Sequence, residues 1–240
     1  FRVFTFEFQL LNFKFLLLIF YTFNFWMIKM VSNKLASALN EVGYNGDIKT
    51  ENIENTIYEA TKNKTRVVIT GTEKRNEITA VILHVLQFHG IETDFITEEN
   101  YSNAQLSTEN DFVIIEAIPN EFFGNLHANI ALITDIPNEN SEIYSDFIAK
   151  ITSGGVLVYN EENASLTNLA ENSQNYFRKF PYKKPNISTK NDTIALETEL
   201  GNISLNTQDL ALVHQLEGAR YICQQLGLLE EDFYEAVMNY

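Results

Sequence analysis

The residues most able to do chemistry lie in one short polar stretch, 71–77, which reads GTEKRNE. This stretch follows a β-branched run at 67–69 and precedes a segment with helical periodicity. A turn between a strand and a helix exposes unpaired N–H groups and the positive helix end, which together bind phosphate. Gly71 permits a tight turn, and Lys74 and Arg75 add positive charge. The pattern predicts a phosphate-binding loop, and a simple glycine turn is the alternative.

A carboxylate at the end of a second apolar run is the candidate metal ligand. Residues 111–116 read DFVIIE, and Glu116 closes this run. Mg²⁺ prefers oxygen ligands such as carboxylates, whereas the alternative for Glu116 is a solvated strand terminus. The four histidines have no carboxylate or cysteine at metal-ligand spacing. Cys223 lies on an apolar helical face, where we expect a buried small residue.

Strands and helices that alternate along the chain must position these residues. The helical pattern after the loop places five apolar residues on one face, Ile78, Val81, Ile82, Val85 and Leu86, and Gly90 suits a left-handed helix stop. Other apolar runs predict strands at 66–70, 94–96, 111–116, 129–134 and 156–160, and helices at 141–151 and about 162–171. This spacing indicates parallel βαβ units, so we predict an α/β fold with an open, mostly parallel sheet flanked by helices.

The alternation changes after about residue 173. Apolar segments near 177–180, 194–196 and 203–205 predict a small antiparallel strand section at 175–206, with Gly201-Asn202 as a hairpin turn. Two predicted helices, about 207–225 and 229–238, close the chain.

The first 30 residues differ in composition from the rest, because they hold nine of the 18 phenylalanines. One interpretation is a translation artefact or fragment, with the true start at Met27 or Met30. A membrane anchor is a second interpretation, although the apolar run is shorter than the roughly 20 residues that span a bilayer. A genuine extension is the third. Residues 31–64 are predicted to form two short helices.

Charge and cysteine content restrict the partners and the compartment. The net charge is −15, and no dense stripe of lysine and arginine is present, so a nucleic-acid partner is not expected. A single cysteine precludes an internal disulfide, which agrees with a reducing compartment and a cytoplasmic location. The sequence specifies no partner, and a membrane contact is expected only if residues 1–30 are a genuine anchor.

Several stretches resemble the central, ATP-binding domain of Mur ligases, in the UDP-N-acetylmuramate:tripeptide (murein peptide) ligase branch. They occur in family order between about residues 48 and 240: KTRVVITGT, ITAVILHVL, NIALIT, GGVLVYNEE, GARYICQQLG and EDFYEA. The resemblance implies a P-loop-type central domain at 65–240 and makes 31–64 a helical remnant of the family's first domain. The UDP-sugar-binding half and the third domain are not matched.

The family's phosphate loop has the form G-T-H-G-K-T-T, and this sequence keeps only Gly71 and Thr72 of it. Lys74 stands at the second glycine, Arg75 at the catalytic lysine and Asn76 at the magnesium-binding threonine. Lysine resists the positive φ that glycine adopts, which predicts a blocked turn. Glu73 and Glu77 add carboxylates, each of which costs about 4 kcal/mol at ~4 Å from a phosphate charge for an effective dielectric constant near 20.

Other family positions have changed as well. Glu116 matches the magnesium-binding acid, but Ile118-Pro119 replaces the acidic pair after it. Glu139-Asn140 stands where the resemblance places an Asp-His pair. The base-binding H-N-x-x-N signature aligns with residues 211–215, ALVHQ, in which none of its polar residues remains.

These losses predict a degenerate, non-catalytic Mur ligase-like domain with lost or weak ATP binding and no expected cofactor. Its vestigial nucleotide-binding residues would be Gly71, Thr72, Lys74, Arg75 and Asn76. The alternative is a divergent ATP-dependent amide ligase for a UDP-N-acetylmuramate-linked substrate. That enzyme would use ATP and Mg²⁺, with Arg75 on the phosphate, Glu116 on the metal and the missing domains supplied by another chain. A membrane-tethered scaffold is a third interpretation, tied to residues 1–30.

Overall fold

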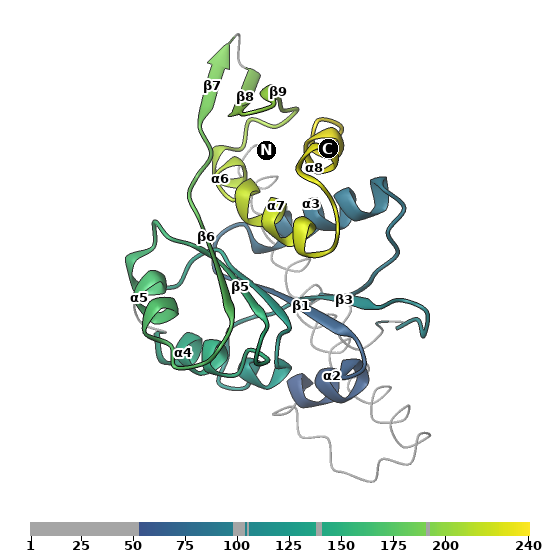
Figure 1. The fold of residues 1–240 in the computed structure, drawn as a ribbon, viewed down its shortest axis with the longest axis vertical. Helices are drawn as coiled ribbons and strands as arrows, with labels where there is room; N and C mark the ends of the chain where they lie inside the picture. Colours follow the sequence, from purple (N-terminus) through teal and green to yellow (C-terminus); the bar gives the residue numbers. More distant parts are fainter. Residues whose placement is uncertain (1–52, 98–103, 105, 138–140, 191–192) are drawn as a thin grey trace, which may run out of the picture. The chain divides into compact units, whose positions relative to one another are not determined.

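A computed structural model describes residues 53–97, 104, 106–137, 141–190 and 193–240 (Figure 1). The interpretations of residues 1–30, the first of the two helices predicted within 31–64 and the Glu139-Asn140 pair lie outside the described residues, whereas the second of those helices is present at Ile53–Thr61. Within the described part, no helix is long and apolar enough to cross a membrane.

Six parallel strands form the central sheet, in the order β2-β3-β1-β4-β5-β6. This confirms the predicted α/β fold with an open parallel sheet. The strands are β1 (Thr65–Thr70), β2 (Asp94–Ile96), β3 (Phe112–Glu116), β4 (Ile130–Ile133), β5 (Val156–Asn160) and β6 (Arg178–Tyr182). Since β1 lies between β3 and β4, the carboxyl ends of these three strands meet at one edge, where α/β sheets place their binding sites.

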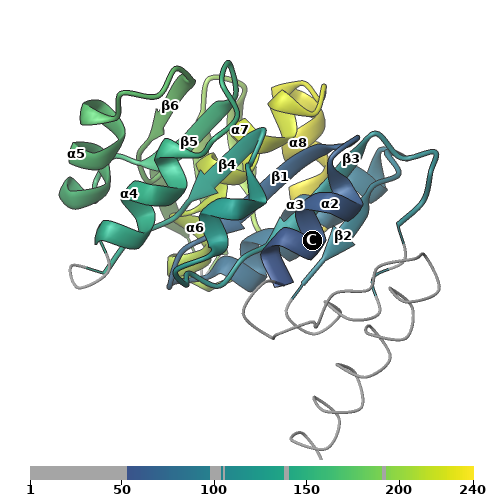
Figure 2. The same ribbon diagram turned by 90° about the horizontal axis from the view of Figure 1, so that it is seen from below.

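Helices cover both faces of the sheet (Figures 1 and 2). On one face lie α3 (Arg75–Phe88), α7 (Leu216–Gln225) and α8 (Glu230–Val237). On the other lie α2 (Ile53–Thr61), the 3₁₀ helix η2 (Phe123–Leu126), α4 (Ser141–Ala149) and α5 (Ala164–Asn172). The predicted apolar face of α3 is confirmed, because its five residues are at most 1% exposed. Gly90 ends this region with φ +68°, as predicted.

A second, antiparallel sheet contains β7 (Ile187–Lys190), β8 (Thr193–Thr198) and β9 (Gly201–Ser204). The predicted antiparallel section at 175–206 is therefore correct only from residue 187 onward. The segment around Phe180 belongs to β6, which pairs in parallel with β5 because α5 returns the chain to the starting edge of the sheet.

Two further local predictions are wrong. The hairpin turn is at residues 199–200, and Gly201-Asn202 belongs to β9, since Thr198 pairs with Gly201. The predicted helix at 207–225 is divided into α6 (Leu210–Val213) and α7. Asp209 caps α6 through its side chain, and the Tyr182 hydroxyl donates to Gln215 Oε1 at 2.5 Å where the two helices separate.

A buried ion pair stabilises the strand end opposite the loop. Lys64 Nζ lies 3.0 Å from Asp94 Oδ2, and the Asp94 side chain is only 4% exposed. Burial raises the pKa of Asp94, but bonds from the Ser107 N–H, Lys64 and Asn110 outweigh it and leave the pKa below its ordinary value of 3.8. This carboxylate therefore contributes stability above its unfolded-state pKa, and the contribution is lost as pH falls through the lowered folded-state pKa.

We expect Asp94→Asn to reduce the free energy of unfolding at pH 7 by about 2 kcal/mol, because charged hydrogen bonds are lost. The difference from the unsubstituted protein should shrink as pH falls from about 5 through the lowered pKa. Urea denaturation followed by circular dichroism at several pH values measures both effects. Glu59→Gln, in an exposed pair with Lys62, is the control and should change stability little. A pH-independent difference for Asp94→Asn would contradict the assignment.

Candidate functional site

The loop between β1 and α3 packs closely against the residues that follow β4. Gly71 has φ +140°, and a β-carbon placed on it would lie 1.9 Å from Thr134 Oγ1. Only glycine fits this approach. Lys74, the residue before α3, has φ 55° and ψ 20°, which is the left-handed conformation. The prediction that lysine blocks the turn is wrong: the turn forms, at a cost of about 1–2 kcal/mol for a left-handed residue with a side chain.

A carboxylate that the sequence analysis missed lies on the backbone donors of this loop. The Thr72 N–H donates to Asp135 Oδ1 at 2.8 Å, and the Glu73 N–H donates to the same oxygen at 3.0 Å. The Thr72 hydroxyl donates to the other oxygen, Oδ2. Asp135 follows β4, as Glu116 closes β3. In the sequence, Asp135 is a carboxylate that follows an apolar run, as Glu116 is. Its contact with the loop could be predicted only from the strand order, which places β4 beside β1.

The candidate metal ligand Glu116 pairs with the loop cation. Arg75 Nε lies 3.1 Å from Glu116 Oε1, and the two side chains are 15% and 4% exposed. Glu116 comes level with Ile69 in the β1–β3 register, which brings its carboxylate to the base of the loop. Its burial contradicts the alternative of a solvated strand terminus. A guanidinium thus lies where a metal bound to Glu116 would bring positive charge.

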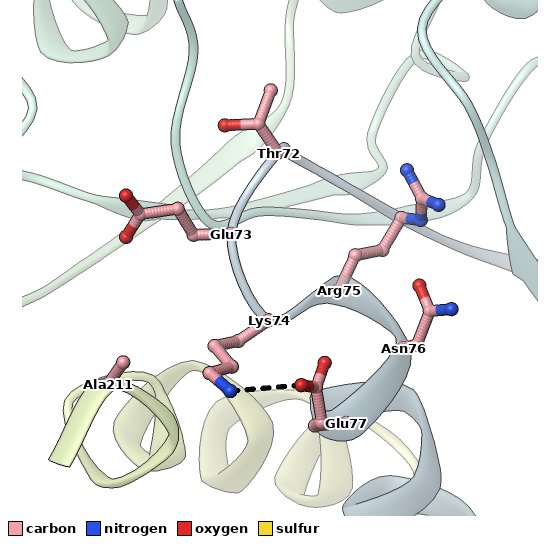
Figure 3. A pocket seen from close by; sticks show the side chains of 7 residues that line it. All are labelled: Thr72, Glu73, Lys74, Arg75, Asn76, Glu77 and Ala211. Carbon is pink, nitrogen blue, oxygen red and sulfur yellow. Dashed lines mark hydrogen bonds and ion pairs between the residues drawn. The ribbon is translucent and has the colours of Figure 1, made fainter. Parts of the chain in front are cut away.

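Lys74 also has internal partners. Its Nζ lies 2.6 Å from Asp209 Oδ2 and 3.0 Å from Glu77 Oε1, and Figure 3 shows the second contact. The hydrogen bond to Asp209 is the main cause that raises the pKa of Lys74, followed by the bond to Glu77. Asp209 is the N-cap residue of α6, so this ion pair joins the loop to the start of that helix.

Four of the five predicted nucleotide-binding residues line one open pocket of about 700 Å³, and the fifth, Gly71, is buried just before them in the chain. The lining residues are Thr72, Glu73, Lys74, Arg75, Asn76, Glu77 and Ala211 (Figure 3). Ala211 reaches the pocket from α6, so the start of the segment 211–215 lies beside the loop. The loop brings two cationic side chains, Lys74 and Arg75, near five carboxylates. These are the side chains of Glu73, Glu77, Glu116, Asp135 and Asp209.

Two buried hydroxyls lie next to each other near the start of the loop, those of Thr70, the residue before Gly71, and of Tyr144. Burial raises the pKa of Tyr144 to about 12, so the phenol is neutral at ordinary pH. The neighbouring Thr70 hydroxyl lowers that pKa, and the charges of Asp135 and Arg75 also affect it.

The histidines and the cysteine lie away from this pocket. Among the described residues, no group of three or more histidine, cysteine or carboxylate side chains is placed to hold a metal ion. The rings of His84 and His89 contact the backbone carbonyls of Ala236 and Asp232 in α8. Cys223 is fully buried, as predicted, and burial raises the pKa of its thiol.

We expect Gly71→Ala to reduce the free energy of unfolding by about 2–4 kcal/mol, because it adds both an unfavourable φ and a clash with Thr134. Gly154→Ala is the matched control. Gly154 has φ +80°, but a β-carbon there meets nothing within 4 Å, so only the backbone cost of about 1–2 kcal/mol applies. Urea denaturation of both variants measures the difference. Equal losses would show that the contact between the loop and β4 is loose.

No protein-family model and no curated protein matches the sequence. Solved structures do match. The murein peptide ligase from Psychrobacter arcticus aligns with TM-score 0.61 at 12% identity, over 78% of this chain and 49% of that one. MurF from Acinetobacter baumannii aligns with TM-score 0.63 at 13% identity, over 77% and 47%. The apo form of L. casei FPGS aligns with TM-score 0.54 at 12% identity, over 87% and 71%.

The chain thus spans about half the length of the first two of these proteins. At 12–13% identity the likeness concerns the fold. The parallel six-stranded sheet, its flanking helices and the small antiparallel sheet together form a Mur ligase-like α/β fold.

Proposed function

We propose that this chain is a degenerate Mur ligase-like domain, related to peptidoglycan-precursor ligases, that catalyses no ligation and has lost or weakened ATP binding. The pair between Arg75 and Glu116 carries the proposal. The resemblance puts these residues at the phosphate-binding lysine and the magnesium-binding acid. Here they neutralise each other across 3.1 Å, so the group for phosphate and the group for metal are both engaged.

The charges around the pocket support the same conclusion. Lys74 is held by Asp209 and Glu77, and the backbone N–H groups of the loop are occupied by the Asp135 carboxylate. A triphosphate would have to separate these contacts and approach several uncompensated carboxylates. Each such approach costs about 4 kcal/mol at ~4 Å with an effective dielectric constant near 20, which equals the binding free energy of a millimolar ligand.

The base-binding position supports the proposal independently. Ala211 lines the pocket where the resemblance places the histidine of the H-N-x-x-N signature, and a methyl group cannot donate a hydrogen bond to a base. The phosphate, metal and base contacts are thus all altered, whereas the core of α3 and the sheet is closely packed.

One observation favours the alternative of a divergent ATP-dependent amide ligase. The loop keeps its glycine-like turn at Lys74, and Glu116 stays buried at its base. Such an enzyme would transfer a phosphoryl group from ATP to a carboxylate and let an amine displace phosphate from the acyl phosphate. The donor set does not fit Mg²⁺ as it stands, because Arg75 would first have to leave Glu116.

We expect isothermal calorimetry of the full chain with ATP and Mg²⁺ to show no saturable binding at millimolar or tighter affinity. A variant with the loop rebuilt should bind, because it removes the opposing carboxylates and restores the glycine and lysine. Its substitutions are Glu73→His, Lys74→Gly, Arg75→Lys, Asn76→Thr, Glu77→Thr and Asp135→Ala.

Glu235→Gln, an exposed change on α8, controls for a general gain from reduced negative charge and should leave ATP binding unchanged. Saturable millimolar binding by the unsubstituted chain would overturn the proposal and favour the ligase alternative. If the rebuilt variant folds but does not bind, the altered base contact at Ala211 is sufficient to prevent binding.

A further inference from the structure

We propose that Asp135 is a tethered anion that fills an intact oxyanion site in the loop, and that this site binds inorganic phosphate once the carboxylate is removed. The inference rests on the proposed function, because it explains why the loop of the unsubstituted chain takes no phosphate. It assigns an inhibitory role to a residue outside the stretch 71–77.

The contacts of Asp135 have the form of bound-anion contacts. Oδ1 accepts from the N–H groups of Thr72 and Glu73 at 2.8 and 3.0 Å, and the Thr134 hydroxyl lies 2.9 Å from the same oxygen. Oδ2 accepts from the Thr72 hydroxyl. Successive backbone N–H groups that point into one concavity bind carboxylate and phosphate oxygens by the same charge-assisted hydrogen bonds.

The donors keep their positions without help from the carboxylate. The Thr134 N–H donates to Thr70 O at 3.1 Å, which fixes the end of β4 beside the end of β1. Gly71 allows the close approach, and the Ile78 N–H donates to Lys74 O at 2.9 Å as α3 begins. Removing the Asp135 side chain therefore leaves a formed site rather than a collapsed loop.

The surroundings of the site also favour an oxyanion. The loop leads into the amino end of α3, a helix of 14 residues whose dipole favours negative charge. The hydroxyl of Thr70, the residue before Gly71, is buried beside that of Tyr144. A phosphate group offers more acceptor oxygens than a carboxylate, so it can accept more hydrogen bonds from the loop.

The covalent attachment of Asp135 to the protein explains why its carboxylate, and not free phosphate, occupies the site. A group attached to the same rigid framework competes at a millimolar or higher effective concentration, so a weakly bound external phosphate loses the competition. A phosphate that displaced the carboxylate would also remain close to its negative charge. Both effects disappear when the side chain is removed.

The test compares Asp135→Ala, Asp135→Asn and the unsubstituted full chain by titration with inorganic phosphate, followed by calorimetry and by amide NMR shifts. Asp135→Ala should bind at least tenfold more tightly than the unsubstituted chain, which corresponds to about 1.4 kcal/mol. Its Thr72 and Glu73 amides should shift with phosphate. Asp135→Asn should gain less, since its amide oxygen still accepts from the same donors.

Asp146→Ala is the matched control, because it removes an exposed aspartate paired with Lys150 and should bind no phosphate. A folded Asp135→Ala variant without phosphate binding would overturn the inference while leaving the proposed function standing. Saturable ATP binding by the unsubstituted chain would overturn both the inference about Asp135 and the proposed function.

If Asp135→Ala does not fold, amide hydrogen exchange of the unsubstituted chain decides the question. The Thr72 and Glu73 amides should then be protected without any added anion, because the carboxylate accepts from them. Exchange of both amides at the rate of unstructured peptide would refute the role of Asp135.

Discussion

The contact between the loop and the end of β4 determines most of what the candidate site can do. Gly71 has no side chain, and this absence lets Thr134 and Asp135 come against the backbone of the loop. Once β1 and β4 are neighbours in a parallel sheet, the residues after each strand must meet at the same edge. The strand order that brings the loop to this edge therefore also brings the Asp135 carboxylate onto the backbone of the loop.

The fold and the site depend on different kinds of interaction. The fold rests on apolar burial: the inner face of α3, the parallel strands and the helices α7 and α8 share one core. Such packing tolerates change as long as volume and pattern persist. The candidate site depends on the sign and shape of a few side chains, so a change at Lys74 or Arg75 would alter it without disturbing the core.

The sequence predicted the parts of the molecule that follow from local periodicity. The predicted strands at 94–96 and 156–160 agree with the structure, as do the apolar face of α3 and the helix stop at Gly90. The sequence analysis did not predict the division between α6 and α7, at which Gln215 accepts a hydrogen bond from Tyr182, a residue distant in sequence.

The candidate site was predictable only in part, for the same reason. The residues of the loop were identified, but their partners come from β3, β4 and the cap of α6. Asp135 carried the same signal as Glu116, a carboxylate after an apolar run. Its importance appears only when the strand order places β4 beside β1. The left-handed Lys74 shows that the surrounding fold can impose a backbone conformation that the residue itself disfavours.

The internal partners of the loop make its response to substitution non-additive. Lys74 pairs with Asp209 and Glu77, Arg75 pairs with Glu116, and the loop N–H groups donate to Asp135. Members of one ion pair or hydrogen-bond network are energetically coupled, so a change in one member leaves its partner without a counter-charge. A single substitution in the loop therefore carries a penalty that a matched double substitution avoids.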